Sequence, residues 1–376
     1  MTFEDYVPIY DGDRYCLMCA HACPVGRVTK RESTTPHGWA LLIASVNRGL
    51  LQWDAETIDV LYQCADCGLC QANCATNRAL PAAIVAARAE VVRLGVLPAS
   101  VTTVDEKLRA NGNPYMTNDG GRRTDSSTTS STRYARSESA QNEALGLFVG
   151  DATLFLRPQF VDAAQKLLGE AALIGVGRSS GYLPYTLGLM DTARTFAQQT
   201  LNEIESLGVK EIITLSAEDA HTFKHVYSEL DVMLPGDVRV MELVECLAQK
   251  LEQGELSVRA ADLHKSFTYH DPCHTPRLPG RARAARKLVR ALMGSAPREM
   301  LFREKLATPC GAIGGLEFTQ PKLAEKLARS RIAEAKSTGA EILLTDDPHC
   351  AAQLEKYADG LPVMNVIEML ADRVSV

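Results

Sequence analysis

Residues 64–74 read CADCGLCQANC and set four cysteines at the spacing C-x2-C-x2-C-x3-C. Three thiolates two residues apart can hold one cuboidal iron–sulfur cluster, while the fourth is carried away to another. Gly68 permits the tight backbone path that this spacing demands. Zinc sites, the alternative, usually pair two C-x2-C knuckles across a longer gap. The stretch therefore predicts iron–sulfur ligation.

A second cysteine group precedes the first. Residues 13–24, DRYCLMCAHACP, repeat the ferredoxin-type run with Asp13 where its first cysteine should stand. In two-cluster ferredoxins the fourth cysteine of each run ligates the other cluster. The expected ligands are Cys64, Cys67, Cys70 and Cys23 for cluster 1, and Cys16, Cys19, Cys74 and Asp13 for cluster 2. Because a carboxylate is a harder ligand than a thiolate, cluster 2 is an Asp13-ligated [4Fe-4S] or a [3Fe-4S] cluster; otherwise Asp13 is an exposed loop residue.

Composition narrows the functional class. The chain has 376 residues and eleven cysteines, seven of them within the first 74 residues, which is unlike a small disulfide scaffold. The net charge of −6 does not favour a nucleic-acid partner. The acidic start lacks a signal-peptide core, and no run of about 18 apolar residues could form a transmembrane segment. We expect a cytoplasmic protein that could sit peripherally at the inner face of the membrane through a partner.

The chain divides at a polar stretch. We expect an α-helical two-cluster ferredoxin domain over 1–113, because helical patterns at 37–50 and 81–95 surround the cysteines. Residues 114–143 are rich in Ser, Thr and Arg, which predicts a flexible linker or a long surface loop. Cys246 matches no motif and is expected in the core.

From residue 145 onward, short apolar runs alternate with amphipathic stretches. The expected strands are 145–149, 172–176, 211–215 and 238–243, and then 267–270, 298–302, 341–345 and 362–366. Such alternation is typical of βαβ units and parallel sheets. LNEIESLGVKEIITL at 201–215 aligns with IAEAKSTGAEILLT at 332–345, which predicts a duplicated α/β unit with repeats at 144–262 and 263–376. The fold class is thus α+β and multidomain.

Three later motifs carry a family resemblance. TYHDPCHTPR (268–277), TPCGAIGG (308–315) and TDDPHC (345–350) resemble the motifs of the cysteine-rich CCG domain. This domain occurs in heterodisulfide reductases and in iron–sulfur subunits of glycolate, D-lactate and glycerol-3-phosphate dehydrogenases. The order of domains resembles the glycolate oxidase iron–sulfur subunit. Residues 144–262 would then be a degenerate CCG-like repeat, and 263–376 a second one.

The departures from the CCG pattern are as informative as the match. Pro309 and Asp347 stand where the family has cysteines, and the first repeat has Asp151, Ser179-Ser180, Ser216 and Asp219 in the matching places. The first repeat should therefore bind no cluster. In the second, the resemblance implies a third iron–sulfur cluster held by Cys273, Cys310 and Cys350, with Asp347, His274 or a substrate completing it. The alternative is three small buried cysteines.

The resemblance implies an electron-transfer subunit. A partner dehydrogenase of the 2-hydroxy-acid type would carry FAD, and electrons would pass singly through two [4Fe-4S] clusters to a quinone or another carrier. The runner-up is catalysis at the C-terminal cluster, as in heterodisulfide reductases, and a third hypothesis is a scaffold. Finally, five arginines at 277, 281, 283, 286 and 290 form a basic helix whose charged face is expected in solvent.

Overall fold

A computed structural model describes residues 3–12, 16–116, 144–274 and 280–375. The expected ligand Asp13, Arg277 of the basic helix and most of the expected linker, residues 117–143, lie outside these ranges. Within them no helix is both long and apolar enough to cross a membrane.

The N-terminal part is helical, as the sequence predicts. Thr35 caps α4 with its side chain on the Gly38 amide, and Asp54 and Thr57 form a capping box at the start of α5. These caps fix where the two helices begin. The elements are η1 (Glu4–Tyr6), α1 (Val7–Tyr10), α2 (Met18–Ala22), α3 (Pro24–Thr29), η2 (Glu32–Thr34), α4 (Pro36–Asn47), α5 (Ala55–Leu61), α6 (Leu69–Ala72), α7 (Leu80–Arg93) and α8 (Ala99–Asn111).

A parallel four-stranded sheet follows, in the order β2-β1-β3-β4. Its strands are β1 (Leu145–Gly150), β2 (Ala172–Arg178), β3 (Glu211–Thr214) and β4 (Arg239–Glu242). The connecting helices are α10 (Asp151–Leu156), α11 (Pro158–Leu168), α12 (Tyr182–Thr186), α13 (Met190–Ser206), α14 (Ala217–His221), η3 (Thr222–Val226), α15 (Tyr227–Glu229) and α16 (Leu243–Gln253). All four strands expected in this part of the chain are confirmed.

A second parallel sheet has the order β6-β7-β8. Its strands are β6 (Phe267–Tyr269), β7 (Ile342–Thr345) and β8 (Val363–Asn365), and a short antiparallel pair joins β5 (Ser257–Val258) to β9 (Val374–Ser375). The helices are α17 (Arg281–Met293), η5 (Glu304–Leu306), α18 (Leu316–Thr319), α19 (Pro321–Ser337), α20 (Pro348–Lys356) and α21 (Val366–Ala371).

The strand predicted over 298–302 is wrong. This segment is irregular, and its one ladder-like bond runs from the Arg298 amide to the Phe267 carbonyl on β6 (2.8 Å). The Arg298 side chain is held instead by the carbonyl of Gly339. The segment thus lies beside β6 without becoming a strand. The duplication of the two sheets stays a prediction.

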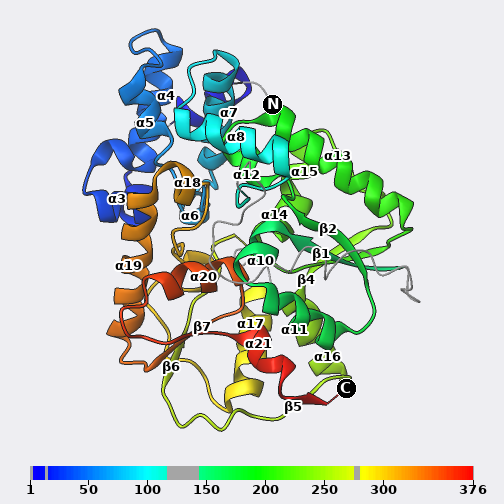
Figure 1. Ribbon diagram of the computed structural model, residues 1–376. Coiled ribbons are helices and arrows are strands. Elements are labelled where there is room, and N and C mark those ends of the chain that lie inside the picture. Colours follow the sequence, from blue (N-terminus) through cyan, green and yellow to red (C-terminus); the bar gives the residue numbers. More distant parts are fainter. Residues whose placement is uncertain (1–2, 13–15, 117–143, 275–279, 376) are drawn as a thin grey trace.

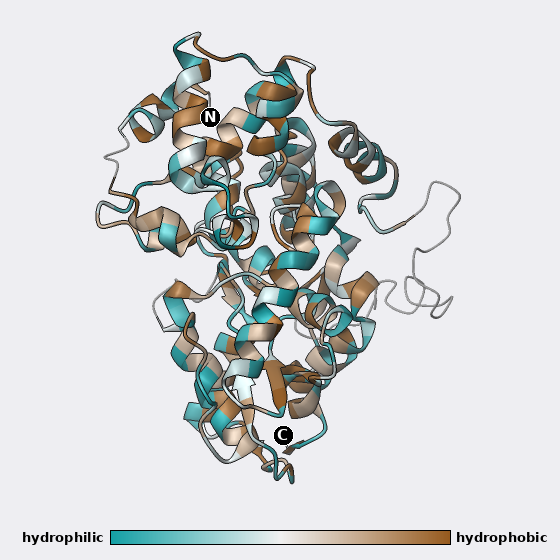
Figure 2. Cartoon of the chain, turned by 90° about the vertical axis from the view of Figure 1, so that its left-hand side faces the viewer, coloured by the Kyte–Doolittle hydropathy of each residue, from teal (hydrophilic) through white to brown (hydrophobic). Residues whose placement is uncertain are grey.

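One continuous core joins the helical part to both later parts. It contains Trp39, Ile84, Phe148, Tyr182 and Leu316, which come from the N-terminal helices, the first sheet and its α12 segment, and α18. In Figure 1, α19 runs beside the N-terminal helices, and it contacts α3. A second core packs α11 on α21 and α16 on α17, between the two sheets. The outer helices carry hydrophilic residues alternating with hydrophobic ones, as their amphipathic sequences predict (Figure 2).

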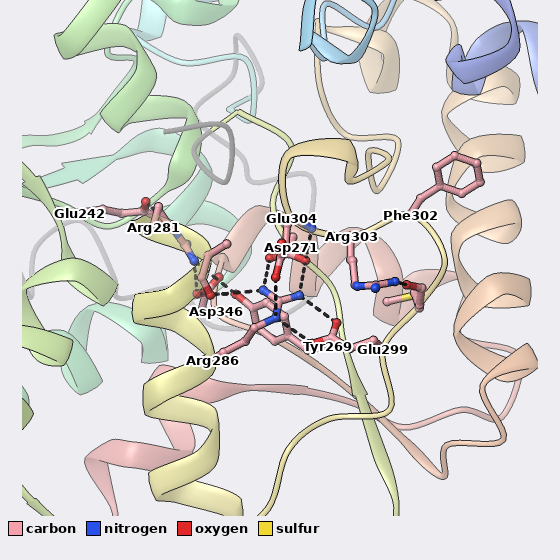
Figure 3. A network of polar contacts seen from close by, with 12 residues as sticks. Glu242, Tyr269, Asp271, Arg281, Arg286, Glu299, Phe302, Arg303, Glu304 and Asp346 are labelled. Carbon is pink, nitrogen blue, oxygen red and sulfur yellow. Dashed lines mark hydrogen bonds and ion pairs between the residues drawn. The ribbon is translucent and has the colours of Figure 1, made fainter. Parts of the chain in front are cut away.

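The basic helix is not simply a solvated face. Arg281 of α17 is fully buried and pairs with Glu242 (2.6 Å) and Asp346 (2.8 Å), at the ends of β4 and β7. Arg286 pairs with Asp271 (2.9 Å) and Glu299 (2.7 Å). Figure 3 shows this network between the sheets. Without the Arg281 and Arg286 guanidinium groups, these carboxylates would be buried without a compensating positive charge. Arg283 and Arg290 are exposed, as expected.

Candidate metal centres

Four cysteines from the two N-terminal groups come together in the core. Cys23, Cys64 and Cys67 are buried, and Cys70 on α6 is partly buried. Gly68 has a φ of 70° and begins α6, which is the left-handed turn that its place between Cys67 and Cys70 requires. Cys23 precedes α3 and accepts a hydrogen bond from the Gly26 amide through its sulfur (3.5 Å).

The chemistry of this group suits a metal cluster. Burial raises the pKa of Cys23 to about 12, and the neighbouring Cys67 and Cys19 add to the rise. Burial also raises the pKa of Cys70, with further contributions from Cys64, Cys67 and Cys23. The thiolates therefore repel one another and are poorly solvated. A cationic iron centre removes both penalties, so these four residues fit the group that the sequence implies.

A second set of cysteines lines a cavity near the surface. The cavity has a volume of about 280 Å³, and the cysteines that line it are Cys16, Cys19, Cys70 and Cys74. Cys16 is exposed, and the adjacent Leu17 and Met18 are 40% and 49% exposed. Burial acts to raise the pKa of Cys74, but hydrogen bonds, first that of Thr76, bring it below its usual value. This group holds all three cysteines expected for cluster 2.

The three C-terminal cysteines also converge, although they come from separate loops. Cys273 follows β6, Cys310 lies in the loop before α18, and Cys350 is in the first turn of α20. They are 4%, 2% and 6% exposed and line one small pocket. A ring nitrogen of His270 and the sulfurs of Cys310 and Cys350 all lie within 4.8 Å of one another. His270 stands in the same motif as Cys273, but its role was not recognised in the sequence.

A hydrogen bond between Cys310 and Cys350 shifts the pKa values of the two thiols in opposite directions. The hydrogen bond from Cys350 lowers the pKa of Cys310, and the same bond, with burial, raises that of Cys350. His349 adds positive charge nearby. Although burial opposes its protonation, Glu317 at 2.8 Å and Glu218 raise the pKa of His349 well above its usual range. The pocket therefore favours one thiolate at Cys310.

The two residues expected to complete this site have other partners. Asp347 accepts hydrogen bonds at Oδ1 from the Cys350 amide (2.8 Å) and at Oδ2 from the Ala217 amide (2.9 Å). It thereby caps α20 and ties it to α14. Nε2 of His274 lies 3.0 Å from the Tyr182 hydroxyl. Both side chains line the pocket, so their ligation stays a prediction.

A chain of polar contacts joins the N-terminal and C-terminal cysteine groups. Asp66, between Cys64 and Cys67, accepts a hydrogen bond from the Tyr182 hydroxyl (2.9 Å), which in turn contacts His274 beside Cys273. Burial raises the pKa of Asp66 to about 6, with Arg88 and the hydroxyls of Tyr182 and Thr186 opposing the rise. The two contacts of the bridge join residues 116 and 92 positions apart, so sequence reasoning could not find it.

A backbone contact runs beside this bridge. A Cβ atom on Gly314 would lie 2.6 Å from the Ala65 carbonyl oxygen, so only glycine lets the 310–315 loop pack directly on the 64–67 loop. Gly314 also has a φ of 68°, in the left-handed region. The CGAIGG segment thus closes against the first cysteine run. Gly314 serves this close approach, whereas Gly311 lies against the Ala324 carbonyl on α19 and Gly315 against the side chains of Leu183 and Leu187.

Arg88 holds the loop that carries the cysteines of residues 64–74, on the side opposite Gly314. This guanidinium on α7 is fully buried and donates to the carbonyls of Cys64 (2.7 Å), Leu61 (3.0 Å) and Thr186 (2.7 Å). Its charge also lowers the pKa of Cys64, against the larger rise that burial causes. A permanent positive charge beside a group of thiolates stabilises their ionised form.

In the first α/β part, buried Asp and Ser side chains occupy the positions that match the cysteines of the CCG motifs. Asp151, Ser180, Ser216 and Asp219 are buried, and Ser216 donates to Asp219 Oδ2 (2.7 Å). Burial raises the pKa of Asp151 to about 7, and the charge of Asp219 adds to it. These side chains form a polar group in which no cysteine takes part. That this repeat binds no cluster stays a prediction.

Comparisons with known proteins agree with the motif analysis. Residues 14–78 match the family model of the 4Fe-4S dicluster domain, and residues 267–355 match that of the cysteine-rich CCG domain. A probable membrane-anchored ferredoxin of Chromohalobacter salexigens is 27% identical over 359 residues, which cover 92% of this chain and 52% of that protein.

Two further relatives carry more specific names. A dihydromethanophenazine:CoB–CoM heterodisulfide reductase subunit of Methanosarcina mazei is 26% identical, with 85% of this chain and 78% of that protein covered. A probable glycolate oxidase iron–sulfur subunit of Bacillus subtilis is 26% identical over 45% of this chain and 38% of its own. The chain spans about half the length of the membrane-anchored relative. Residues 14–78 are therefore similar to 4Fe-4S dicluster domains and residues 267–355 to cysteine-rich CCG domains, and the chain resembles the iron–sulfur subunits of the heterodisulfide reductase and glycolate oxidase type.

Proposed function

We propose that this chain is the electron-relay subunit of an oxidoreductase complex. It would take electrons singly from a partner flavoprotein, an FAD-dependent dehydrogenase of the 2-hydroxy-acid type, and pass them to a quinone or another carrier. The observation that carries the proposal is the contact between the first cysteine run and the C-terminal cysteine pocket, through Asp66, Tyr182 and His274. Two redox sites linked in this way suit a relay better than a scaffold.

The proposed ligands follow the two groups of cysteines. Cluster 1 takes Cys23, Cys64, Cys67 and Cys70, whose thiol pKa values depend on one another's charges. Cluster 2 takes Cys16, Cys19 and Cys74 at the surface cavity, with Asp13 as its fourth ligand or with one iron fewer. Cys70 lines the cavity as well, so its sulfur would lie between the two clusters. The partner would exchange electrons at the exposed Cys16 end.

The third proposed centre takes Cys273, Cys310 and Cys350, with Asp347, His274 or a substrate as alternatives for completing it. When bound, iron–sulfur clusters supply one-electron redox chemistry with little movement of their ligands. The protein contributes the surrounding charges. Arg88 stabilises thiolates in the first run, and His349 stabilises Cys310. Tyr182 and the Ala65–Gly314 contact hold the two sites close together.

A catalytic role at the C-terminal pocket is the second candidate. The hydrogen bond between the thiols of Cys310 and Cys350, which lowers the pKa of Cys310, favours it. The likeness to the heterodisulfide reductase subunit of Methanosarcina mazei also favours it. The presence of Pro309 and Asp347 at two family cysteine positions argues against the full set of ligands used there. Peripheral association with a membrane through a partner fits either candidate, given the membrane-anchored relative.

Anaerobic redox titration followed by EPR separates these candidates. Cys67→Ser, Cys74→Ser and Cys350→Ser should each remove or alter a different signal, whereas the control Cys246→Ser, on α16 and outside all three groups, should alter none. If Cys67→Ser and Cys74→Ser leave every signal intact, the relay is wrong. A signal that depends on Cys350 and changes when a disulfide is added would favour catalysis.

A further inference from the structure

One ring nitrogen of His270, a residue close to Cys310 and Cys350, makes no hydrogen bond within the described residues. His270 is fully buried, and its Nε2 atom has no hydrogen-bond partner among the described residues. A buried N–H without an acceptor costs about 1–3 kcal/mol, so native structures rarely keep one. The sulfurs of Cys310 and Cys350 are close, because one ring nitrogen and both sulfurs lie within 4.8 Å of one another.

The other ring nitrogen decides the tautomer. Nε of Arg331 lies 2.9 Å from His270 Nδ1. A guanidinium has only donors and stays protonated, so Nδ1 must accept this bond. A neutral ring then carries its proton on Nε2. A ring protonated on both nitrogens could not accept the bond from Arg331, so the ring is neutral.

Both members of this pair are held firmly in place. The His270 amide donates to the Leu344 carbonyl on β7 (2.8 Å), so the backbone of His270 continues the sheet. Arg331, on α19 and 1% exposed, also donates to the Phe302 carbonyl (2.8 Å) and pairs with Glu334 (2.7 Å). Turning the ring over would place a C–H against Arg331. The orientation is therefore fixed.

This orientation argues against a ligand role for the ring. A histidine that binds a metal through one nitrogen normally donates the proton of the other to an acceptor. In this structure the group beside His270 Nδ1 is the Arg331 guanidinium, which is a donor and cannot accept a proton from the ring. Neutral His270 thus has no free lone pair to offer at Nε2.

We propose that His270 is a positioning residue whose Nε2–H, aimed by Arg331, donates a hydrogen bond to a sulfur of the Cys310–Cys350 site. The effect on redox potential rests on the proposed third centre, whereas the tautomer does not. Hydrogen bonds to the sulfurs of a cluster stabilise its reduced form and raise its reduction potential. The pair would make the C-terminal centre easier to reduce, so that it draws electrons from cluster 1.

Pulsed EPR and potentiometry on the anaerobic full chain test the effect. We expect an exchangeable proton coupled to the centre and no strongly coupled histidine nitrogen. Arg331→Met and His270→Phe should lower the midpoint potential of the signal that Cys350→Ser removes. The expected size is about tenfold in the reduced-to-oxidised ratio at fixed potential, or about 59 mV. Arg329→Met, an exposed change on the same helix, should shift nothing.

A strongly coupled nitrogen that His270→Phe abolishes, or unchanged potentials in both variants, would overturn the proposal. If Cys350→Ser removes no signal, the third centre is wrong, and 15N NMR of 15N-histidine-labelled protein then tests the tautomer alone. A proton on Nε2 in the wild type, but no longer fixed there in Arg331→Met, supports the assignment. A proton on Nδ1 in the wild type refutes it.

Discussion

Buried charged side chains stabilise the backbone around the cysteines, and Arg88 is the clearest example. Its guanidinium satisfies three backbone carbonyls and lies over the ring of Tyr62, 4.9 Å from the centroid. Arg88→Met leaves these buried acceptors without donors and should lower the free energy of unfolding by on the order of 4 kcal/mol. Anaerobic urea denaturation would measure the loss.

Arg93→Met is the matched control for Arg88→Met, because Arg93 lies on the same helix with a side chain 69% exposed and paired with Glu90. This variant should change stability by less than about 0.5 kcal/mol. Equal losses in the two variants would show that the carbonyl bonds of Arg88 add nothing.

Asp151 should make stability fall as the pH rises. Its pKa is about 7 in the folded chain, against 3.8 as the ordinary value, because of burial and the like charge of Asp219. Between about pH 4 and 7 the folded state binds a proton that the unfolded state has released, so stability is lost across this window.

The substitution that tests Asp151 is Asp151→Asn, which keeps a carbonyl oxygen for the Ala152 amide (2.9 Å). Relative to the wild type, it should be more stable at pH 8 by on the order of 2 kcal/mol and nearly unchanged at about pH 4.5. Urea midpoints at both values measure this. Asp191→Asn, at a side chain 91% exposed, should have the same effect on stability at both pH values. If Asp151→Asn also has the same effect at both pH values, the raised pKa of Asp151 is refuted.

At the scale of elements, α17 connects the two sheets through Arg281 (Figure 3). Arg281→Met leaves Glu242 and Asp346 buried without their cation, and should lower stability by about 3–5 kcal/mol. Arg290→Met, at an exposed position of the same helix, is expected to be nearly neutral. Thermal unfolding of the two variants measures the difference, and similar melting temperatures would mean that the network does not stabilise the contact between the sheets.

Most elements were predictable from sequence, because their signals are local. Pro36 and Pro81 mark helix starts, and the Gly208 and Gly339 turns precede buried strands. The segment 298–302 was an exception. Its apolar content resembles a strand, but Arg298 binds the Gly339 carbonyl, and this long-range contact outweighs local propensity. Arg281 and Arg286 were misjudged for the same reason, since their acidic partners lie on other elements.

For the whole molecule, cysteine spacing predicted which cysteines form each group. The contacts that connect the N-terminal and C-terminal groups were not predictable from sequence. Cys64, Cys67 and Cys70 are neighbours by local geometry, and Cys273, Cys310 and Cys350 by position at the end of a sheet. Tyr182 reaches Asp66 and His274 only because the α12 segment packs between the helical part and the second sheet. Such contacts depend on tertiary packing, which leaves no periodic trace in the sequence.

The central claim is that this chain holds iron–sulfur clusters at its N-terminal cysteines. The most direct test is the content of iron and acid-labile sulfide in the full chain purified without oxygen. The account predicts about eight of each per chain from two [4Fe-4S] clusters, about seven iron if cluster 2 is [3Fe-4S], and more if the C-terminal centre is occupied. Zinc without acid-labile sulfide would contradict it.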